Sequence, residues 1–432
     1  MSGPSSRLTV VQLIPALQAG GAERSVLEIG RALVAAGHRS LVLSAGGRLV
    51  EALQTEGSEH LTLDLGRKSL RSLAKVLPLR RQLAAIQPDI VHVRSRLPAW
   101  LAALAMRGLP SRPAVVSTVH GLNSPGRYSS IMVRADAVIA VSDTVRDYIG
   151  THYPWLPDDR LTVIPRGVDP QAFPRGHRPS SIWLADWAAR YPHLAGGRLL
   201  VLPGRGTRLK GHRHGLALMA RLRARGLDVR LWMPGVVEPG REAYLAELKA
   251  LASELGVAEQ VEFSPSQTDI REICAMAEIV LQLSDKPEAL GRTVLEGLSL
   301  GRPVVGFAHG GVGELLVRHY PQGAVPLADA EALANTVAGL LFKPQRPRLC
   351  RHRIWPRCRR PPCRSMPGSR LRGARRTECQ APRAACTLVY DEHRSDFATA
   401  GRPAAGTKDC GGERCRLITS RRMHVPAGLP GC

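Results

Sequence analysis

Residues 285–297 read Asp285-Lys286-Pro287-Glu288-Ala289-Leu290-Gly291-Arg292-Thr293-Val294-Leu295-Glu296-Gly297. They follow a strand-like run at 279–283 and lead into a short helix that ends before Pro303. Glu288 is therefore expected in the loop before the helix, and Glu296 about two turns along it. Backbone N–H groups near Gly291 lie between the two acids. A helix N-terminus flanked by two carboxylates can bind an anion and the hydroxyl groups attached to it, and a sugar nucleotide has both.

The chain around this segment alternates strand and helix signals in two blocks. The block at 1–165 starts with a strand at 8–14 and a helix at 22–36, and further short β-rich runs follow. A second alternation begins at Arg198, and residues 166–197 between the blocks are rich in Pro, Arg and Trp. Apolar strands that alternate with helices indicate parallel sheets covered on both faces. We therefore predict an α/β protein with two doubly wound, Rossmann-like domains, at 1–165 and 198–342, that face each other across a cleft. Residues 166–197 are the predicted linker.

Charge and cysteine content separate a C-terminal tail from this body. The chain of 432 residues has a net charge of +24, of which residues 343–432 contribute +15. Eight of the nine cysteines lie in the same segment. Because the tail has neither strand nor helix periodicity, we predict that 343–432 is largely disordered. Its Arg-, Pro-, Ala-, Gly- and Cys-rich composition is typical of a GC-rich coding region translated out of frame, which is a hypothesis about its origin.

Targeting and membrane-spanning signals are weak in this sequence. No apolar run approaches the roughly 18 residues that cross a bilayer, and the apolar start at 7–14 is explained better by a buried first strand than by a signal peptide. The expected location is the cytoplasm. Residues 66–81 contain six cations and no acid, with leucines at helical spacing. This basic amphipathic stretch is either a solvated helix face or a contact with an anionic membrane surface on the inner face of the cell membrane.

Three further motifs lie where predicted strands end. Gly20-Gly21 follows the first strand, and allows either a tight turn or a close approach of the backbone to a phosphate. Arg205 and Lys210 lie in the Gly-rich loop 203–211, where two cations suit a diphosphate. His120 lies two residues after the strand-like run at 114–118, and a neutral imidazole there could hydrogen-bond a sugar hydroxyl. Ligands of doubly wound sheets bind at the carboxyl ends of the strands, so a common cleft is expected.

Together these motifs resemble the GT-B retaining glycosyltransferases, specifically glycosyltransferase family 4. The resemblance covers about residues 7–342. Residues 163–169 read Val-Ile-Pro-Arg-Gly-Val-Asp, with Phe173 following, and are similar to the family's VIPNGVD…F signature, with Arg166 in place of the usual Asn. The sequences of segments 204–207 and 291–296 are most similar to those of family members that build bacterial lipopolysaccharide.

The resemblance implies an enzyme that transfers a sugar from a nucleotide-diphosphate sugar, with retention at the anomeric carbon, to a lipopolysaccharide or another cell-envelope glycan. It implies no metal or other cofactor, because protein cations would neutralise the diphosphate. Glu288 and His120 are the implied catalytic residues, on the sugar side of the site. The implied donor-binding residues are Arg205, Lys210, Gly291, Arg292, Thr293, Glu296, Gly20 and Gly21.

Two other functions remain open from the sequence. One is a sugar-nucleotide epimerase on the same fold. The other is an inactive product whose basic tail binds nucleic acid non-specifically, since members of the family end with helices that clasp the first domain and the tail does not resemble them. Specific nucleic-acid binding is not expected, because the aromatic residues of the tail are few and far apart.

Overall fold

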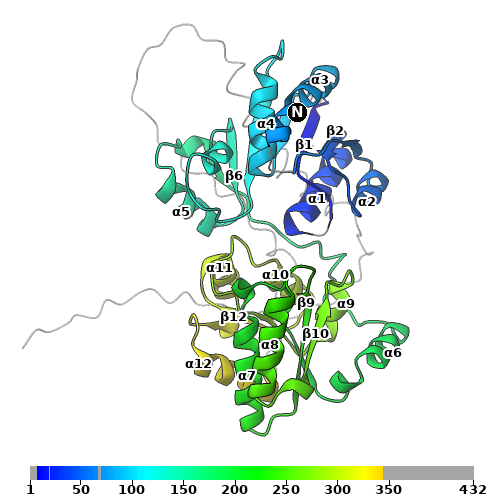
Figure 1. Ribbon diagram of the computed structural model, residues 1–432, viewed down its shortest axis with the longest axis vertical. Helices are drawn as coiled ribbons and strands as arrows, with labels where there is room; N and C mark the ends of the chain where they lie inside the picture. Colours follow the sequence, from blue (N-terminus) through cyan, green and yellow to red (C-terminus); the bar gives the residue numbers. More distant parts are fainter. Residues whose placement is uncertain (1–6, 19, 67–69, 344–432) are drawn as a thin grey trace, which may run out of the picture.

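The computed structural model describes residues 7–18, 20–66 and 70–343. The two α/β domains follow one another along the long axis of the molecule, with the N-terminal one blue to cyan and the C-terminal one green to yellow (Figure 1). The prediction of disorder for the tail falls on residues beyond 343 and lies outside the described part. Among the described residues, no helix is long and apolar enough to cross a membrane.

The N-terminal domain is built on a seven-stranded parallel sheet in the order β3-β2-β1-β4-β5-β6-β7. Its strands are β1 (Thr9–Leu13), β2 (Arg39–Ser44), β3 (Glu59–Thr62), β4 (Ile90–Val93), β5 (Ala114–Val119), β6 (Ala137–Ala140) and β7 (Leu161–Val163). The helices are α1 (Gly21–Ala35), α2 (Val50–Thr55), α3 (Val76–Ile86), α4 (Arg96–Met106) and α5 (Asp143–His152), with 3₁₀ turns η1 (Leu70–Lys75) and η2 (Ser129–Val133). The central strands β4 and β6 are buried throughout, as a parallel sheet covered on both faces requires.

The C-terminal domain has a six-stranded parallel sheet in the order β10-β9-β8-β11-β12-β13. Its strands are β8 (Arg198–Val201), β9 (Val229–Val237), β10 (Val261–Pro265), β11 (Ile279–Gln282), β12 (Val304–Phe307) and β13 (Ala324–Val325). Its helices are α6 (Ser181–Arg190), α7 (His212–Ala224), α8 (Glu242–Glu254), α9 (Ile270–Met276), α10 (Arg292–Ser299), α11 (Gly310–His319) and α12 (Ala330–Phe342), with the 3₁₀ turn η5 (Arg208–Lys210). The predicted fold class, two doubly wound sheets, is confirmed.

Each sheet carries its own aliphatic core, and the segment between the sheets joins the second one. Val168, Phe173 and Trp187 are buried in the C-terminal core. Trp187 of α6 lies 6.0 Å, between ring centroids, from Trp232 of β9. The segment 166–197 therefore packs on the C-terminal domain in addition to connecting the two sheets.

The basic stretch 66–81 changes its helical form part-way. The 3₁₀ turn η1 ends at Lys75 and α3 begins at Val76, so Pro78 lies in the first turn of α3. Proline is tolerated there because the first N–H groups of a helix have no intrahelical partner.

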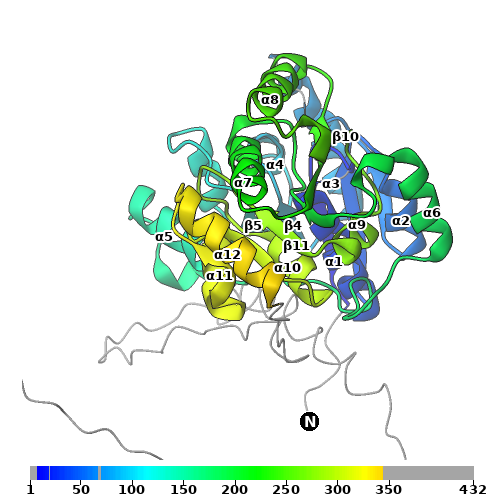
Figure 2. The same ribbon diagram turned by 90° about the horizontal axis from the view of Figure 1, so that it is seen from below.

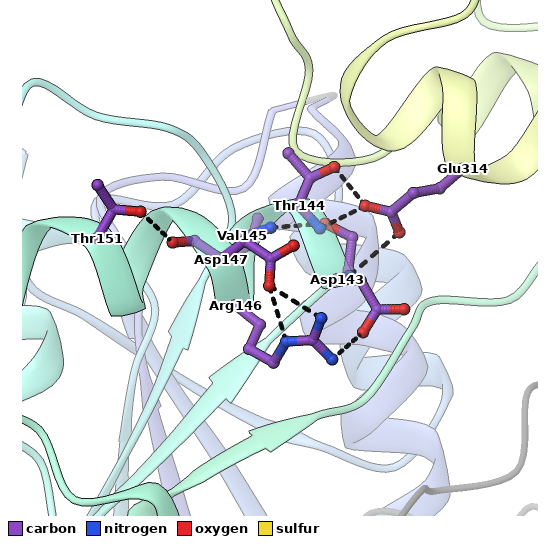
Figure 3. A network of polar contacts seen from close by, with 8 residues as sticks. Asp143, Thr144, Val145, Arg146, Asp147, Thr151 and Glu314 are labelled. Atoms are coloured by element: carbon purple, nitrogen blue, oxygen red, sulfur yellow. Dashed lines mark hydrogen bonds and ion pairs between the residues drawn. The ribbon is translucent and has the colours of Figure 1, made fainter. Parts of the chain in front are cut away.

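A carboxylate of one domain caps a helix of the other. Glu314 of α11 accepts hydrogen bonds from the backbone N–H of Asp143, at 3.1 Å, and from the backbone N–H and hydroxyl of Thr144 (Figure 3). These N–H groups open α5, where the helix has unpaired donors and a partial positive charge. Arg146 pairs with Asp143 at 2.5 Å, which offsets the repulsion between Asp143 and Glu314. The contact holds α11 against α5 at one side of the interface.

Candidate functional site

Lys210 and Glu288 meet at the carboxyl edge of the C-terminal sheet. Lys210 ends η5, just after β8, and its Nζ lies 2.7 Å from Glu288 Oε1. The same oxygen accepts hydrogen bonds from Gln282 Nε2, at 2.9 Å, and from the Ser284 hydroxyl. Three donors therefore hold one carboxylate in place. The sequence predicted both residues for the site but did not single out Gln282, the last residue of β11, or Ser284, two residues beyond it.

Close backbone contacts hold the two loops that carry this pair. Gly211 has φ +70°, and a Cβ atom on it would lie 1.7 Å from the carbonyl oxygen of Leu283. The Glu288 carbonyl accepts a hydrogen bond from Gly311 N at 2.7 Å, at the start of α11. The loop with Lys210 thus touches the loop with Glu288, and the latter rests on α11. This backbone packing fixes the position of the Lys210–Glu288 pair.

Glu296, the second predicted acid, lies on α10. Its side chain is almost fully buried, at 4% exposure. Arg292 Nε approaches Glu296 Oε1 at 2.9 Å, one turn apart on α10. Arg24 of α1 lies 3.6 Å from the same oxygen. The carboxylate therefore has two cationic partners, one from each domain.

Arg292 also connects the domains directly. Its Nη2 lies 2.8 Å from Glu28 Oε1 on α1. A Cβ atom on Gly21 would lie 3.8 Å from Arg292 Cδ, so the glycine turn at the start of α1 faces the start of α10 (Figure 1 and Figure 2). Burial acts to lower the pKa of Arg292, but Glu28 and Glu296 outweigh it and raise the pKa. Gly20, Gly21, Arg292 and Glu296, all predicted for the site, thus lie in one region between the domains.

The remaining predicted residues differ in their exposure. Thr293 is half-buried in the first turn of α10, and Gly291 is the buried residue before that helix. Arg205 is exposed in the loop after β8. The loop 288–290 reaches the other domain as well, since Ala289 is part of the N-terminal core. The Glu288 segment therefore contributes to both the site and the domain contact.

His120 lies at the end of β5, in the domain opposite Lys210. Burial lowers its pKa well below the usual value, and the charges of Arg166 and Arg94 lower it further. The imidazole is therefore neutral at physiological pH. Its Nε2 is buried and has no hydrogen-bond partner among the described residues. A neutral ring with a free nitrogen can donate to or accept from a hydroxyl group.

Metal-binding residues are not gathered at this edge. Within the described ranges, no group of three or more His, Cys, Asp or Glu side chains is arranged to hold a metal ion. The cations near the two acids are Lys210, Arg292 and Arg24.

Comparison with family models decides the classification. Residues 19–172 match the model "Glycosyltransferase Family 4", and residues 186–353 match "Glycosyl transferases group 1". The chain is a GT-B glycosyltransferase. The two matches fall on the N-terminal and the C-terminal sheet, and so place the glycine turn in one model and the Lys210–Glu288 pair in the other.

Individual relatives agree with this classification. Over 386 residues this glycosyltransferase is 26% identical to the glycogen synthase of Mycobacterium tuberculosis, which covers 79% of the chain and 88% of the relative. A glycosyltransferase from Rickettsia africae superposes with a TM-score of 0.67 and 27% identity, over 78% of this chain and 89% of its own. Anabaena HepE in complex with UDP-glucose has the same fold, with a TM-score of 0.64, 20% identity and coverage of 78% and 90%.

Proposed function

We propose that this glycosyltransferase transfers a sugar, with retention at the anomeric carbon, from a nucleotide-diphosphate sugar to a lipopolysaccharide or another cell-envelope glycan. The observation that carries the donor half of the proposal is the contact of Lys210 with Glu288, 2.7 Å apart although 78 positions separate them. A cation next to a carboxylate at the carboxyl ends of parallel strands suits a donor that has a diphosphate and a sugar.

In this proposal the charges of the protein act on the departing diphosphate. Lys210 and Arg205 bind it from the C-terminal domain, and the N–H groups at the start of α10, from Gly291 to Thr293, add partial positive charge. The turn at Gly20-Gly21 lets the N-terminal backbone approach the phosphates. Stabilisation of the negative charge that develops on the leaving group is then the main catalytic contribution, and no metal ion is needed.

The acids and His120 act on the sugar and ribose. Glu288 is placed to accept hydrogen bonds from hydroxyls of the donor sugar near the reacting carbon. Glu296 takes the ribose hydroxyls, and its present partners, Arg292 and Arg24, adjust when the ribose binds. His120, held neutral, hydrogen-bonds a sugar hydroxyl from the other domain. No side chain is assigned as a covalent nucleophile, and in this proposal the acceptor attacks from the same face of the sugar that the diphosphate leaves.

A panel of nucleotide sugars tests the proposal. We expect one donor to raise the melting temperature of the protein and to give a transfer product on a cell-envelope glycan fraction. NMR of that product should show the anomeric configuration of the donor, and EDTA should leave the rate unchanged. Inversion would contradict the retaining assignment. Conversion of the donor to its epimer without transfer would favour the sugar-nucleotide epimerase instead.

We also propose that the N-terminal domain contacts an anionic membrane surface through η1 and α3. Leu73 and Leu77 are 56% and 57% exposed there, and Arg81 beside them is exposed. The Arg80 side chain packs against its own domain, where it donates hydrogen bonds to the carbonyl oxygens of Leu104 and Ala105 in α4. Arg67 and Lys68 lie outside the described residues. Exposed leucines flanked by cations are typical of surfaces that bind anionic lipid.

Vesicle sedimentation with phosphatidylglycerol tests this contact. Leu77→Ser should weaken binding about tenfold, because burying one leucine contributes about 1.5 kcal/mol or more. Ile182→Ser is the matched control, since Ile182 is 82% exposed on α6 of the other domain. Equal binding of the two variants to the vesicles would contradict the proposed membrane contact.

A further inference from the structure

Two arginines that follow strands of the N-terminal sheet lie buried without a close carboxylate for each of them. Arg94 follows β4 and is 4% exposed. Its Nη1 donates to Gln12 Oε1 at 3.1 Å, and its Nη2 donates to the Ser25 hydroxyl. Both partners are neutral, and the Arg94 Nε has no partner among the described residues. Gln12 and Ser25 fix the guanidinium in place but do not neutralise it.

Arg166 follows β7, and its side chain is 12% exposed. Its Nη1 lies 3.8 Å from Glu28 Oε2, a long ion pair, while the other oxygen of Glu28 is held by Arg292 at 2.8 Å. The Arg166 Nε is buried and also lacks a partner within the described ranges. Burial lowers the pKa of Arg166 to about 10, against the opposing effect of Glu28. The charged guanidinium is therefore poorly compensated.

The charges of the cluster do not balance. Arg24, Arg94, Arg166 and Arg292 are linked to one another through two carboxylates, those of Glu28 and Glu296. Within the described residues, these four arginines therefore outnumber the carboxylates with which they form ion pairs. Arg31 pairs with Asp169 instead, at 3.4 Å, and Glu56 lies close enough to Arg31, Asp169 and Glu28 to interact with them electrostatically. A buried cation without a close counter-charge is costly, and a bound anion would offset that cost.

The position of the surplus charge points to the acceptor. Lys210 and Arg205, the cations assigned to the donor diphosphate, are on the C-terminal domain. Arg94 and Arg166 follow strands of the opposite sheet, and both influence the His120 ring electrostatically. Resting on the proposed glycosyl transfer, we propose that Arg94 and Arg166 bind an oxyanion group of the acceptor, a phosphate or a carboxylate. The planar forks of two arginines suit either group.

The sequence adds a reason to treat this as a specificity feature. Arg166 replaces the Asn in the VIPNGVD signature that residues 163–169 resemble. An Asn side chain could donate a hydrogen bond there but would bring no charge. The replacement therefore adds a positive charge to the cluster. Arg166→Asn removes that charge while it introduces a residue that the signature accommodates.

Calorimetric titration with charged and neutral sugars tests the proposal. Glucose 6-phosphate, glucuronate and glucose are titrated into the full chain, with and without saturating UDP or GDP. In the wild-type protein we expect one of the charged sugars to bind at least about tenfold tighter than glucose. Preference for glucose 6-phosphate would indicate a phosphate on the acceptor, and preference for glucuronate would indicate a carboxylate. Saturation with nucleotide keeps glucose 6-phosphate out of the donor site.

The variants then locate the effect. Arg166→Asn and Arg94→Gln should lose most of the preference for the charged sugar and keep the affinity for the nucleotide. Arg31→Asn, the control, should keep both. If Arg94→Gln does not fold, Arg166→Asn alone decides. Equal binding of charged and neutral sugars by the wild type, or a loss of nucleotide affinity in Arg166→Asn, would overturn the proposal. Failure of the wild type to bind any nucleotide or nucleotide sugar would instead contradict the proposed function.

Discussion

Lys210→Ala is expected to weaken binding of the nucleoside diphosphate roughly 10- to 150-fold. The variant loses one charge-assisted contact with the diphosphate, worth about 1.5–3 kcal/mol. It also leaves Glu288, 2.7 Å away in the wild type, without its cation. The free carboxylate then repels the diphosphate, which places the expected effect at the upper end of the range. Calorimetric titration of the nucleoside diphosphate measures it.

Two further variants separate these contributions. Arg208→Ala is the matched control, because Arg208 lies in the same η5 turn but pairs with Glu247 at 2.5 Å on the surface. Its diphosphate affinity should stay within about twofold of the wild type. Lys210→Ala combined with Glu288→Gln should recover part of the affinity without recovering transfer, since the repulsion is gone but the contact with the donor sugar is lost. If the affinity of Lys210→Ala for the diphosphate is unchanged, this loop does not bind the diphosphate.

The sequence was sufficient for the parts of the fold and site that depend on local signals. Apolar runs predicted the central strands β1 and β8. The glycine-rich loop with Lys210 and the loop with Glu288 both follow such strands, so their meeting follows from the topology of a parallel sheet. The edge strands β3 and β7 were missed. Their residues are exposed or half-buried, and they lack the apolar pattern that marks a buried strand.

Contacts between the domains could not be predicted in the same way. Glu314 and Thr144 are 170 positions apart, and neither belongs to a periodic pattern that indicates a partner. Arg292 was predicted for its backbone position at the start of α10, whereas its side chain joins Glu28 to Glu296. Arg94 follows a strand and could have been found by its position, but its significance depends on the neutrality of Gln12 and Ser25. Such charge balances depend on which side chains the folded chain brings together.

The second large effect is expected for Gly211→Ala, a loss of stability of about 2–5 kcal/mol. Alanine at φ +70° costs about 1–2 kcal/mol, because its Cβ crowds the following carbonyl group. In addition, the new Cβ would lie 1.7 Å from the Leu283 carbonyl oxygen, so the backbone must move, at a cost of about 1–3 kcal/mol. The melting temperature should fall by roughly 5–15 °C. Lys210, the preceding residue, moves with the loop, so diphosphate affinity should fall as well.

Gly226→Ala separates the cost of the positive φ angle from the cost of the contact with Leu283. Gly226 has φ +72°, nearly the same backbone conformation, but a Cβ atom there would meet nothing within 4 Å. It should therefore lose only about 1–2 kcal/mol and leave diphosphate affinity unchanged. The difference between the two variants measures the contact between the Lys210 loop and Leu283, which immediately precedes Ser284 in the Glu288 loop. Equal melting temperatures would mean that the two loops do not touch, and the Lys210–Glu288 pair would then lose the backbone packing that positions it for the donor.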